Sequence, residues 1–399
     1  MTWQTYALND VFTSIKNGLS VKQSKDKEGL PITRIETISS GVIDIEKVGY
    51  AGLSVEDVSG WLLEDGDILL SHINSLEHIG KVAQYTEDLG DLVHGMNLVC
   101  LRAKREFLYP KFALYYFRTS TFKNNLLHFV NQSVNQCSIS VTHLKNINIL
   151  LPPVEEQKKI VTVLDKAQVL IDKRKESIAK LDELIQSAFL DMFGDLFVNP
   201  KGWLVREFDY FAKIDTKMTK DFIVYGNYPH IGIDNIEKNT GRLIHYKSVK
   251  EDRLVSNKYI FTEEHIIYSK IRPYLNKVAL PNFKGLCSAD AYPILINKEN
   301  TNRYFFAYIL RSKYFLGYVE KVSNRTNIPK VNKKQLEGFS CIAPPIQLQD
   351  EFANIVLNVE AYKVKLNKSL DKMEDNFNSL VQQAFKGELK VNTEITASI

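Results

Sequence analysis

The same sequence pattern occurs twice in this chain, and the repeat constrains the fold more than any other feature. Six pairs of segments match in one order along the 399 residues, at offsets between 198 and 192 residues. The matched pairs begin at Leu30 and Tyr228, Asp67 and His265, Lys81 and Lys277, Phe112 and Phe305, Leu144 and Leu336, and Leu184 and Leu380. Chance matches would not stay collinear, so we infer a duplicated unit of about 195 residues and a pseudo-two-fold molecule.

Each copy ends in a segment with the heptad pattern of a long helix. A proline pair, Pro152-Pro153 or Pro344-Pro345, comes first, and prolines can precede a helix but not lie inside one. Apolar residues then recur at alternating steps of four and three, and Gly194 or Gly387 follows as a stop signal. The first seam is Ile160, Leu164, Ala167, Ile171, Ile178, Leu181, Ile185, Ala188 and Met192. The second is Phe352, Val356, Val359, Leu366, Leu370, Met373, Phe377, Leu380 and Ala384.

These patterns predict two helices of about 35 residues, each about 50 Å long. A lone helix would expose its apolar seam, so we expect the two copies to pack against each other, antiparallel if the pseudo-two-fold holds. Arg174 and Lys363 occupy the one polar break in each seam. Periodicity alone leaves a second interpretation open, in which the helices serve only self-assembly.

The segments before the two proline pairs have the pattern of mixed α/β domains. Short β-rich runs are predicted as strands over 67–73, 98–101, 266–269 and 292–296. Aromatic residues at helical spacing predict helices over 112–117 and 305–310. The predicted fold class is α+β, with two mixed domains joined by two long antiparallel helices. The predicted segments are 1–151, 152–199, 200–343 and 344–399.

Charge is distributed unevenly between the two copies. Residues 200–343 carry 24 Lys and Arg against 14 Asp and Glu, a net charge of +10, whereas residues 1–151 have a net charge of −2. A strongly basic segment indicates a polyanionic partner or, equally, a generic basic surface. Four scattered cysteines, no apolar run of about 18 residues and no signal-peptide pattern at the start predict a cytoplasmic protein with free thiols.

Motifs for phosphate binding, metal binding and catalysis are absent from the sequence. No two glycines stand two residues apart, and the P-loop spacing of Gly90 and Gly95 has Met96 in place of lysine. No HExxH occurs among the eight histidines. The proline pairs also lack the flanking residues of an amino-methyltransferase motif. The sequence therefore favours a binding module without catalytic or metal-binding residues.

The segments around the two proline pairs resemble a known family. Leu144-Lys145-Asn146-Ile147, followed by 151–160 (LPPVEEQKKI), is similar to the hallmark of the specificity subunits of type I restriction-modification enzymes. The second copy, 328–336 followed by Pro344-Pro345, and the Ala-Phe pairs at both helix ends look the same, except that Gln347-Leu348 replaces two glutamates. The resemblance covers the whole chain.

The resemblance implies a non-catalytic subunit in which two target recognition domains each read half of a bipartite double-stranded DNA sequence. It implies that the helices act as a ruler and dock two modification subunits, with motor-nuclease restriction subunits joining to form the restricting complex. S-adenosylmethionine, ATP and Mg²⁺ are expected only in those partners, which methylate adenine. Half-sites one helical turn apart are separated by about 34 Å, which a rod of about 50 Å can span.

Candidate DNA-binding residues lie in loops and at strand ends, where Arg, Lys, Asn, Gln and Ser suit base and phosphate contacts. An ordinary polar loop is the alternative for each. In the first copy they are Lys22, Lys25, Ser71, His72, Asn74, Gln132, Asn135 and Gln136. In the second copy they are Lys217, Lys220, Lys270, Arg272, Tyr274, Asn324, Arg325, Asn327 and Lys330.

Partner-binding residues are expected on the two helices, from the resemblance. They are the motif glutamines, the polar seam breaks and the helix-end phenylalanines: Gln157, Gln349, Arg174, Lys363, Phe189 and Phe385. Two other functions remain open at this point. One is a coiled-coil scaffold without DNA specificity, and the other is a DNA enzyme that lacks familiar motifs.

Overall fold

A computed structural model describes residues 3–24, 26–132, 137–323 and 329–389. They form two compact units. Unit 1 contains the residues up to Lys175 together with those from Ser369 onward, and unit 2 runs from Glu176 to Lys368. The predicted segments give each long helix a segment of its own, whereas here each long helix contributes residues to both units.

The two long helices are α6 (Val154–Phe193) and α11 (Ile346–Phe385), and each has 40 residues. Both begin directly after their proline pair, as predicted. Each helix is about five residues longer than the predicted length of about 35 residues. Gly194, with a φ of +82°, follows α6 and its N–H donates to the carbonyl of Leu190 at 2.8 Å, which caps the last turn.

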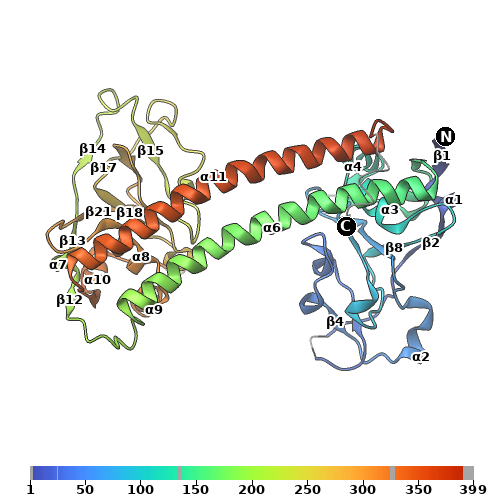
Figure 1. Cartoon of the computed structure of the whole chain (residues 1–399), viewed down its shortest axis with the longest axis horizontal. Helices are drawn as coiled ribbons and strands as arrows, with labels where there is room; N and C mark the ends of the chain where they lie inside the picture. The colour runs from blue at the N-terminus through green and yellow to red at the C-terminus, as the bar shows by residue number, and fades with distance from the viewer. Residues whose placement is uncertain (1–2, 25, 133–136, 324–328, 390–399) are drawn as a thin grey trace. The chain divides into compact units, whose positions relative to one another are not determined.

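Within each unit, α6 and α11 lie side by side with opposite chain directions, as predicted (Figure 1). In unit 1 the Lys175 ammonium is 2.7 Å from the Glu374 carboxylate. In unit 2 the Lys363 ammonium is 2.7 Å from the Asp182 carboxylate. The predicted seam residues are buried or half-buried in both helices, so the heptad pattern identified the packed face.

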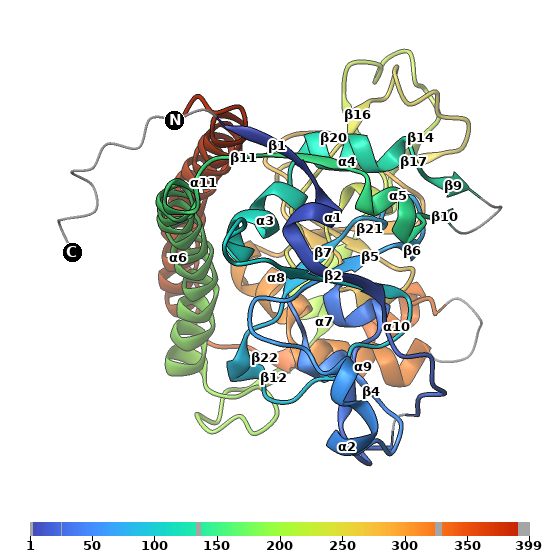
Figure 2. The ribbon, with the colours of Figure 1, turned by 90° about the vertical axis from the view of Figure 1, so that its right-hand side faces the viewer.

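A four-stranded antiparallel sheet forms the centre of unit 1, in the order β2-β8-β5-β7. Its strands are β2 (Phe12–Asn17), β8 (Leu98–Ala103), β5 (Ile68–Ser71) and β7 (Val82–Gln84). Helices α1 (Leu8–Val11), α3 (Pro110–Phe117), α4 (Ser120–Leu127) and α5 (Val141–Lys145) pack near it, and α2 (Val55–Val58) is peripheral. β1 (Gln4–Ala7) pairs with β11 (Asn148–Leu151), which leads into α6 (Figure 2).

Two small sheets complete unit 1. β6 (Ile73–Asn74), β10 (Cys137–Ser138) and β9 (Asn131–Gln132) form one, and β3 (Pro31–Ile32) with β4 (Gly49–Tyr50) forms the other. The single strand predicted over 67–73 is therefore wrong. It is divided at His72, where the chain leaves the central sheet to pair with β10.

The central sheet of unit 2 has the same order, β13 (Ala212–Ile214), β21 (Ala291–Ile296), β18 (His265–Ser269) and β19 (Val278–Ala279). β12 (Val205–Glu207) pairs with β22 (Ser340–Ile342), as β1 pairs with β11. A five-stranded sheet is added, consisting of β14 (Met218–Thr219), β17 (Lys258–Phe261), β20 (Gly285–Cys287), β15 (Pro229–Ile231) and β16 (Lys247–Ser248). The helices are α7 (Phe208–Phe211), α8 (Arg303–Arg311), α9 (Lys313–Ser323) and α10 (Lys333–Glu337).

Each unit has a core in which aromatic side chains of the predicted short helices meet the long helices. In unit 1, Phe112 of α3 is fully buried and its ring lies 4.9 Å from that of Phe385. In unit 2, Phe305 of α8 is fully buried and lies 4.9 Å from Phe193. The predicted helices over 112–117 and 305–310 are confirmed.

All four cysteines are buried and free. None of the helices in the described ranges combines the length and apolar character that a membrane span requires. In the same ranges, no three histidine, cysteine or acidic side chains gather into a group that could hold a metal ion.

Candidate nucleic-acid interface

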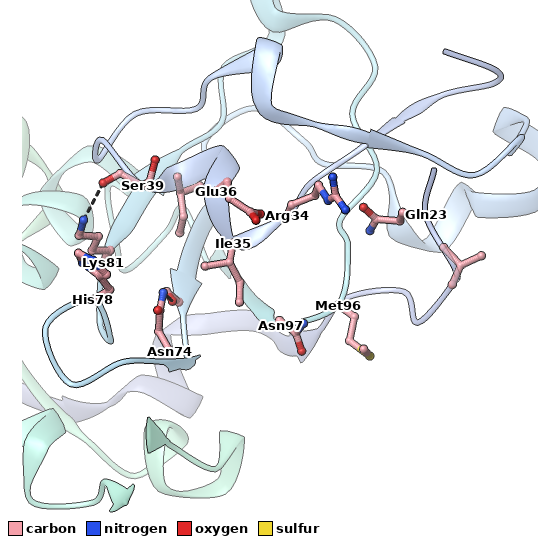
Figure 3. A pocket seen from close by; sticks show the side chains of 13 residues that line it. Gln23, Arg34, Ile35, Glu36, Ser39, Asn74, His78, Lys81, Met96 and Asn97 are labelled. Atoms are coloured by element: carbon pink, nitrogen blue, oxygen red, sulfur yellow. Dashed lines mark hydrogen bonds between the residues drawn. The ribbon is translucent and has the colours of Figure 1, made fainter. Parts of the chain in front are cut away.

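An open polar pocket lies in unit 1 where three distant chain segments meet. Its volume is about 610 Å³, and we call it the unit 1 pocket. The pocket is lined by Val21, Gln23, Arg34, Ile35, Glu36, Ile38, Ser39, Ser71, Asn74, His78, Lys81, Met96 and Asn97. Figure 3 shows these side chains gathered around it. Its size falls in the range of ligand sites, and nine of its 13 lining residues are polar or charged.

Backbone contacts hold the pocket segments in place. The turn before β8 lies against the segment after β3, because the Gly95 N–H donates to the buried Thr33 hydroxyl at 2.8 Å. A Cβ on Gly95 would lie 2.0 Å from the Thr33 carbonyl oxygen, so only glycine allows this approach. Asn97 then adopts the left-handed conformation, with a φ of +74°. The positions of Arg34 and Asn97 are therefore fixed by the same tight contact.

Several polar groups of the unit 1 pocket are free to bind a ligand. Among the described residues, the Arg34 guanidinium and the Glu36 carboxylate form no hydrogen bond or ion pair, and Arg34 is half-buried. The Gln23 Oε1 and His78 Nδ1 atoms also have no partner, but both are buried, and Gln23 Oε1 packs against Gly49, so neither atom is open to a ligand. The Lys81 ammonium instead donates to the Ser39 carbonyl at 2.7 Å and closes one wall. The pocket thus presents donors and acceptors that the chain itself does not satisfy.

In unit 2, the strand end at Ser269 has the same backbone hydrogen bond and strand pairing as the strand end at Ser71, but the side chains around it differ. Ser71 donates its N–H to the Lys81 carbonyl at 2.9 Å, and Ser269 donates to the Lys277 carbonyl at 3.0 Å. Ser71 pairs with Leu98, as Ser269 pairs with Ala291. This register aligns Asn74 with Arg272, Asn97 with Asp290, Arg34 with Gly232 and Glu36 with Asp234. Each unit thus has one arginine among these aligned positions, Arg34 in unit 1 and Arg272 in unit 2, and the two arginines come from segments that do not correspond to each other.

Two of the DNA-binding predictions in unit 1 are corrected by burial. Ser71 is only 1% exposed although it lines the unit 1 pocket, and His72, directly after it, is 5% exposed. Burial lowers the pKa of His72 and favours its neutral form. Asn74 is half-buried and lines the pocket. Lys22 and Gln132 are exposed, while Lys25, Asn135 and Gln136 lie outside the described residues.

In unit 2, the end of β18 and the segment before α10 lie together. The Arg272 N–H donates to the Pro329 carbonyl at 2.8 Å, and Ile271 forms a bridge with Lys330. The exposed predicted residues are Lys217, Lys220, Arg272, Tyr274 and Lys330. Asn324, Arg325 and Asn327 lie outside the described residues.

Among the predicted DNA-binding residues of unit 2 that the structure describes, Lys270 is half-buried and the others are exposed. Its ammonium lies 4.9 Å from the centre of the Tyr292 ring. Burial, and after it the charge of Lys330, lowers the pKa of Lys270. Which of these side chains contacts DNA stays a prediction.

Gln157 and Gln349 do not face a partner, which corrects the prediction that they do. Both are 0% exposed. The Gln157 amide accepts from the Tyr109 N–H at 2.8 Å and donates to the Phe107 and Pro152 carbonyls at 2.8 Å. Each glutamine therefore ties the first turn of a long helix to the adjacent globular part.

Gln349 makes one more bond than Gln157. It accepts from the Thr301 hydroxyl at 2.8 Å and from the Asn302 N–H at 2.9 Å. It donates to the Asn300 and Pro344 carbonyls at 3.2 and 2.8 Å. Its amide is thus fully occupied within unit 2.

The remaining predicted partner residues differ in accessibility. Phe189 is 2% exposed among Phe193, Phe305, Tyr308 and Phe352, so a partner cannot reach it and this prediction is wrong. Phe385 is half-buried against α3, and Arg174 is half-buried as well. Lys363 is 17% exposed and already bonds Asp182 and Glu360.

Sequence reasoning missed Arg34, Gln23 and Asn97 in the unit 1 pocket. They stand in separate segments, up to 74 residues apart, and no local motif marks any of them. One available indication was the Asn97-Leu98 step at the start of a buried strand, since asparagine tolerates the left-handed conformation that such a turn needs.

A family model described as the type I restriction modification DNA specificity domain matches the chain twice, over residues 1–183 and 200–373. The type I restriction enzyme MjaX specificity subunit of Methanocaldococcus jannaschii is 32% identical, over 98% of this chain and 94% of that protein. The EcoDI specificity subunit of Escherichia coli is 35% identical, over 48% of this chain and 43% of that protein.

Solved structures share the fold. The type I restriction-modification S subunit from M. genitalium superposes with a TM-score of 0.55 at 14% identity, over 96% of each chain. A chain from a study of type I R-M complex assembly gives a TM-score of 0.55 at 16% identity, over 97% of this chain and 98% of that one. The two alternative functions, a scaffold and a DNA enzyme, gain no support from these comparisons. The chain belongs to the type I restriction modification DNA specificity family and carries two copies of its specificity domain.

Proposed function

We propose that each unit of this specificity subunit reads one half of a bipartite DNA target, and that the chain itself is not catalytic. The observation that carries this proposal is the repeated central sheet, which holds different polar side chains at the same strand ends. Two domains that share a scaffold but present different polar side chains are suited to reading two different short DNA sequences.

The paired helices are proposed to set the distance between the half-sites and to dock two modification subunits. The amides of Gln157 and Gln349 fix the start of each helix to its globular part, so helix length can be transmitted to the reading surfaces. The outer faces of the helices expose apolar side chains, including Val169, Leu170 and Val364. Such side chains suit a protein partner.

We place the chemistry in the partner subunits. S-adenosylmethionine for adenine methylation, and ATP with Mg²⁺ for the motor-nuclease subunits, would be held there and not by this chain. The proposal is thus a division of labour in which this chain contributes position and sequence selection to a reaction that its partners carry out.

The first test is a genome-wide map of N6-methyladenine in cells with and without this gene. Loss of one bipartite motif on deletion would support the proposal and would reveal both half-sites and the spacer. Insertion of one heptad into each long helix keeps the seam in phase and adds about 10 Å of helix, or about three base pairs. The spacer is then expected to lengthen, with both half-sites unchanged.

Replacement of residues 1–151 by the corresponding segment of a relative with another target supplies the matched experiment. Only one half-site should change. A complete complex whose methylation pattern is unaffected by this exchange would contradict the proposal and favour a scaffold role.

A further inference from the structure

We infer that the unit 1 pocket reads a base edge of one half-site, and that Arg34 is the side chain that selects a guanine there. This inference rests on the proposed function of unit 1 as a half-site reader. It adds to the predicted candidates a side chain of another segment that lines the same pocket as Ser71, whereas Ser71 and His72 are buried.

The state of Arg34 carries the inference. Its guanidinium lines an open pocket, and among the described residues it has no carboxylate, carbonyl or hydroxyl partner. Two other arginines of unit 1 differ: Arg102 is paired with Asp67 at 2.7 Å, and Arg118 donates to the Gly41 carbonyl at 2.6 Å. The Arg34 guanidinium therefore keeps its planar set of donors available to a ligand that enters the pocket.

The surrounding groups favour a base over a phosphate. A phosphate site would collect cations, whereas Glu36 lines the same pocket and the Lys81 ammonium is engaged by the Ser39 carbonyl. The Asn97 amide, which also lines the pocket, adds a neutral donor and a neutral acceptor. Arginine pairs with guanine O6 and N7, amides with adenine, and a carboxylate accepts from cytosine N4. This mixture matches base edges.

The backbone around Arg34 supports selection as well. Thr33, next to it, receives the Gly95 N–H at the tight contact that also fixes Asn97. These contacts hold the backbone that carries Arg34, so the backbone loses little conformational freedom on binding. In unit 2 the position aligned with Arg34 is Gly232, and the arginine of this region is Arg272, which aligns with Asn74. The two units are therefore expected to select different bases at this place.

The test uses the complete chain with its modification subunits in a host without other N6-adenine methylation. Three variants are compared with the wild type: Arg34→Ala, Arg34→Lys and, as the matched control, Arg105→Ala. Arg105 is 66% exposed, lies outside the pocket and carries the same charge. Methylated motifs are mapped genome-wide, and affinity is measured on duplexes that carry each base at each position of the half-site.

Arg34→Ala should lower the preference for guanine at one position of one half-site by about fivefold to 150-fold. The other half-site should be unchanged. Arg34→Lys keeps the charge but loses the planar fork, so it should relax the same position, and Arg105→Ala should not. A half-site that keeps its sequence in both Arg34 variants would overturn the inference, as would a uniform loss of affinity for all sequences, which indicates a phosphate contact.

Failure of the inference is distinguishable from failure of the proposed function. If the wild-type complex yields no bipartite motif, the proposed function fails. If the wild type yields a motif that the Arg34 variants leave intact, only the assignment of Arg34 fails. Should Arg34→Ala not assemble, Arg34→Lys retains the charge and side-chain bulk and still decides the question.

Discussion

The central sheets of units 1 and 2 have the same strand order, but the surfaces on them differ in charge and in polar side chains. Residues 200–343 have a net charge of +10 and residues 1–151 a net charge of −2. Unit 2 also carries an additional five-stranded sheet. Unit 1 has an acidic group, Glu36, inside its candidate reading pocket.

This difference indicates two ways of holding DNA on one scaffold. Unit 2 has exposed lysines, such as Lys217 and Lys220, that suit contacts with phosphates and a strong dependence on salt. Unit 1 must depend more on shaped polar contacts and on its partner subunits. The predictions below test how far the two units differ in stability and in binding.

The largest expected effect comes from the helix-end phenylalanines. Phe189→Ala removes a ring that is 2% exposed among four aromatic neighbours, and it should destabilise unit 2 by about 3–5 kcal/mol. Phe385→Ala should cost unit 1 less, because Phe385 is only half-buried. Hydrogen exchange of the complete chain, read separately for peptides of each unit, measures both values. Equal losses would show that the two helix ends are equivalent.

The next prediction compares the two motif glutamines, Gln157 in unit 1 and Gln349 in unit 2, by the stability that each contributes. Gln349→Ala leaves four hydrogen-bonding groups without a partner and Gln157→Ala leaves three, so losses of about 3 kcal/mol or more are expected, with Gln349→Ala the larger. Urea unfolding measures the loss. Lys158→Ala, next to Gln157 but half-exposed, is the control and should change stability by less than about 1 kcal/mol.

Acid should weaken unit 1 through His94. Burial lowers the pKa of His94 to about 4, and its ring lies 3.0 Å from the Leu98 carbonyl, so the folded state keeps it neutral. The unfolded chain binds a proton near pH 6.5, and stability should fall by about 2–3 kcal/mol as the pH drops from 6.5 toward 4. Above pH 7 this contribution is fully present.

Urea unfolding at pH 7 and pH 5 tests the His94 effect, followed by Trp61 fluorescence in a chain that carries Trp3→Phe and Trp203→Phe, since the Trp61 and His94 rings lie 6.3 Å apart. His94→Gln should reduce the pH dependence. In unit 2, His265 also has a lowered pKa from burial, but Asp215 opposes the shift, so a smaller acid effect is expected there. An unchanged pH dependence in His94→Gln would contradict the prediction.

The smallest effect concerns salt. Lys217→Ala and Lys220→Ala should each weaken DNA binding almost equally for all sequences and lower the slope of log K against log salt by about 1 per lost phosphate contact. Lys22→Ala is the corresponding variant in unit 1, and its slope should change less than the slopes of the two unit 2 variants. Equilibrium titrations at several salt concentrations measure the slopes. A slope that depends on Lys22 as much as on Lys217 would remove the proposed difference between the units.

The helices could be predicted from local sequence, whereas the pocket could not. Proline pairs, a heptad seam and a following glycine are local signals, and α6 and α11 begin at the predicted residues. Gln157 and Gln349 also had a usable signal. Each glutamine lies three residues before the first apolar residue of its seam, so the heptad spacing places it on the packed face of the helix as well. A polar side chain on that face must be buried and hydrogen-bonded. We interpreted them from the resemblance instead.

The unit 1 pocket depends on contacts between segments far apart in the chain. Arg34 and Asn97 are neighbours only because Gly95 approaches Thr33 closely. The segment after Ser71 likewise depends on distant chain, because β6 pairs with β10, more than 60 residues later, and the Ile139 N–H donates to the His72 carbonyl at 2.9 Å. A strand end in the sequence looks exposed until the segment that covers it is known.

The division of α11 between the units has a consequence for biosynthesis. Ala384 is fully buried in the core of unit 1, and Phe377, Leu380 and Phe385 pack against that core. Unit 2, in contrast, is one continuous stretch of chain. A ribosome delivers residues from the N-terminus onward, and domains generally fold as units once their sequence has emerged. The globular part translated first must therefore wait for the last helix, and the unit translated second is the first to be complete.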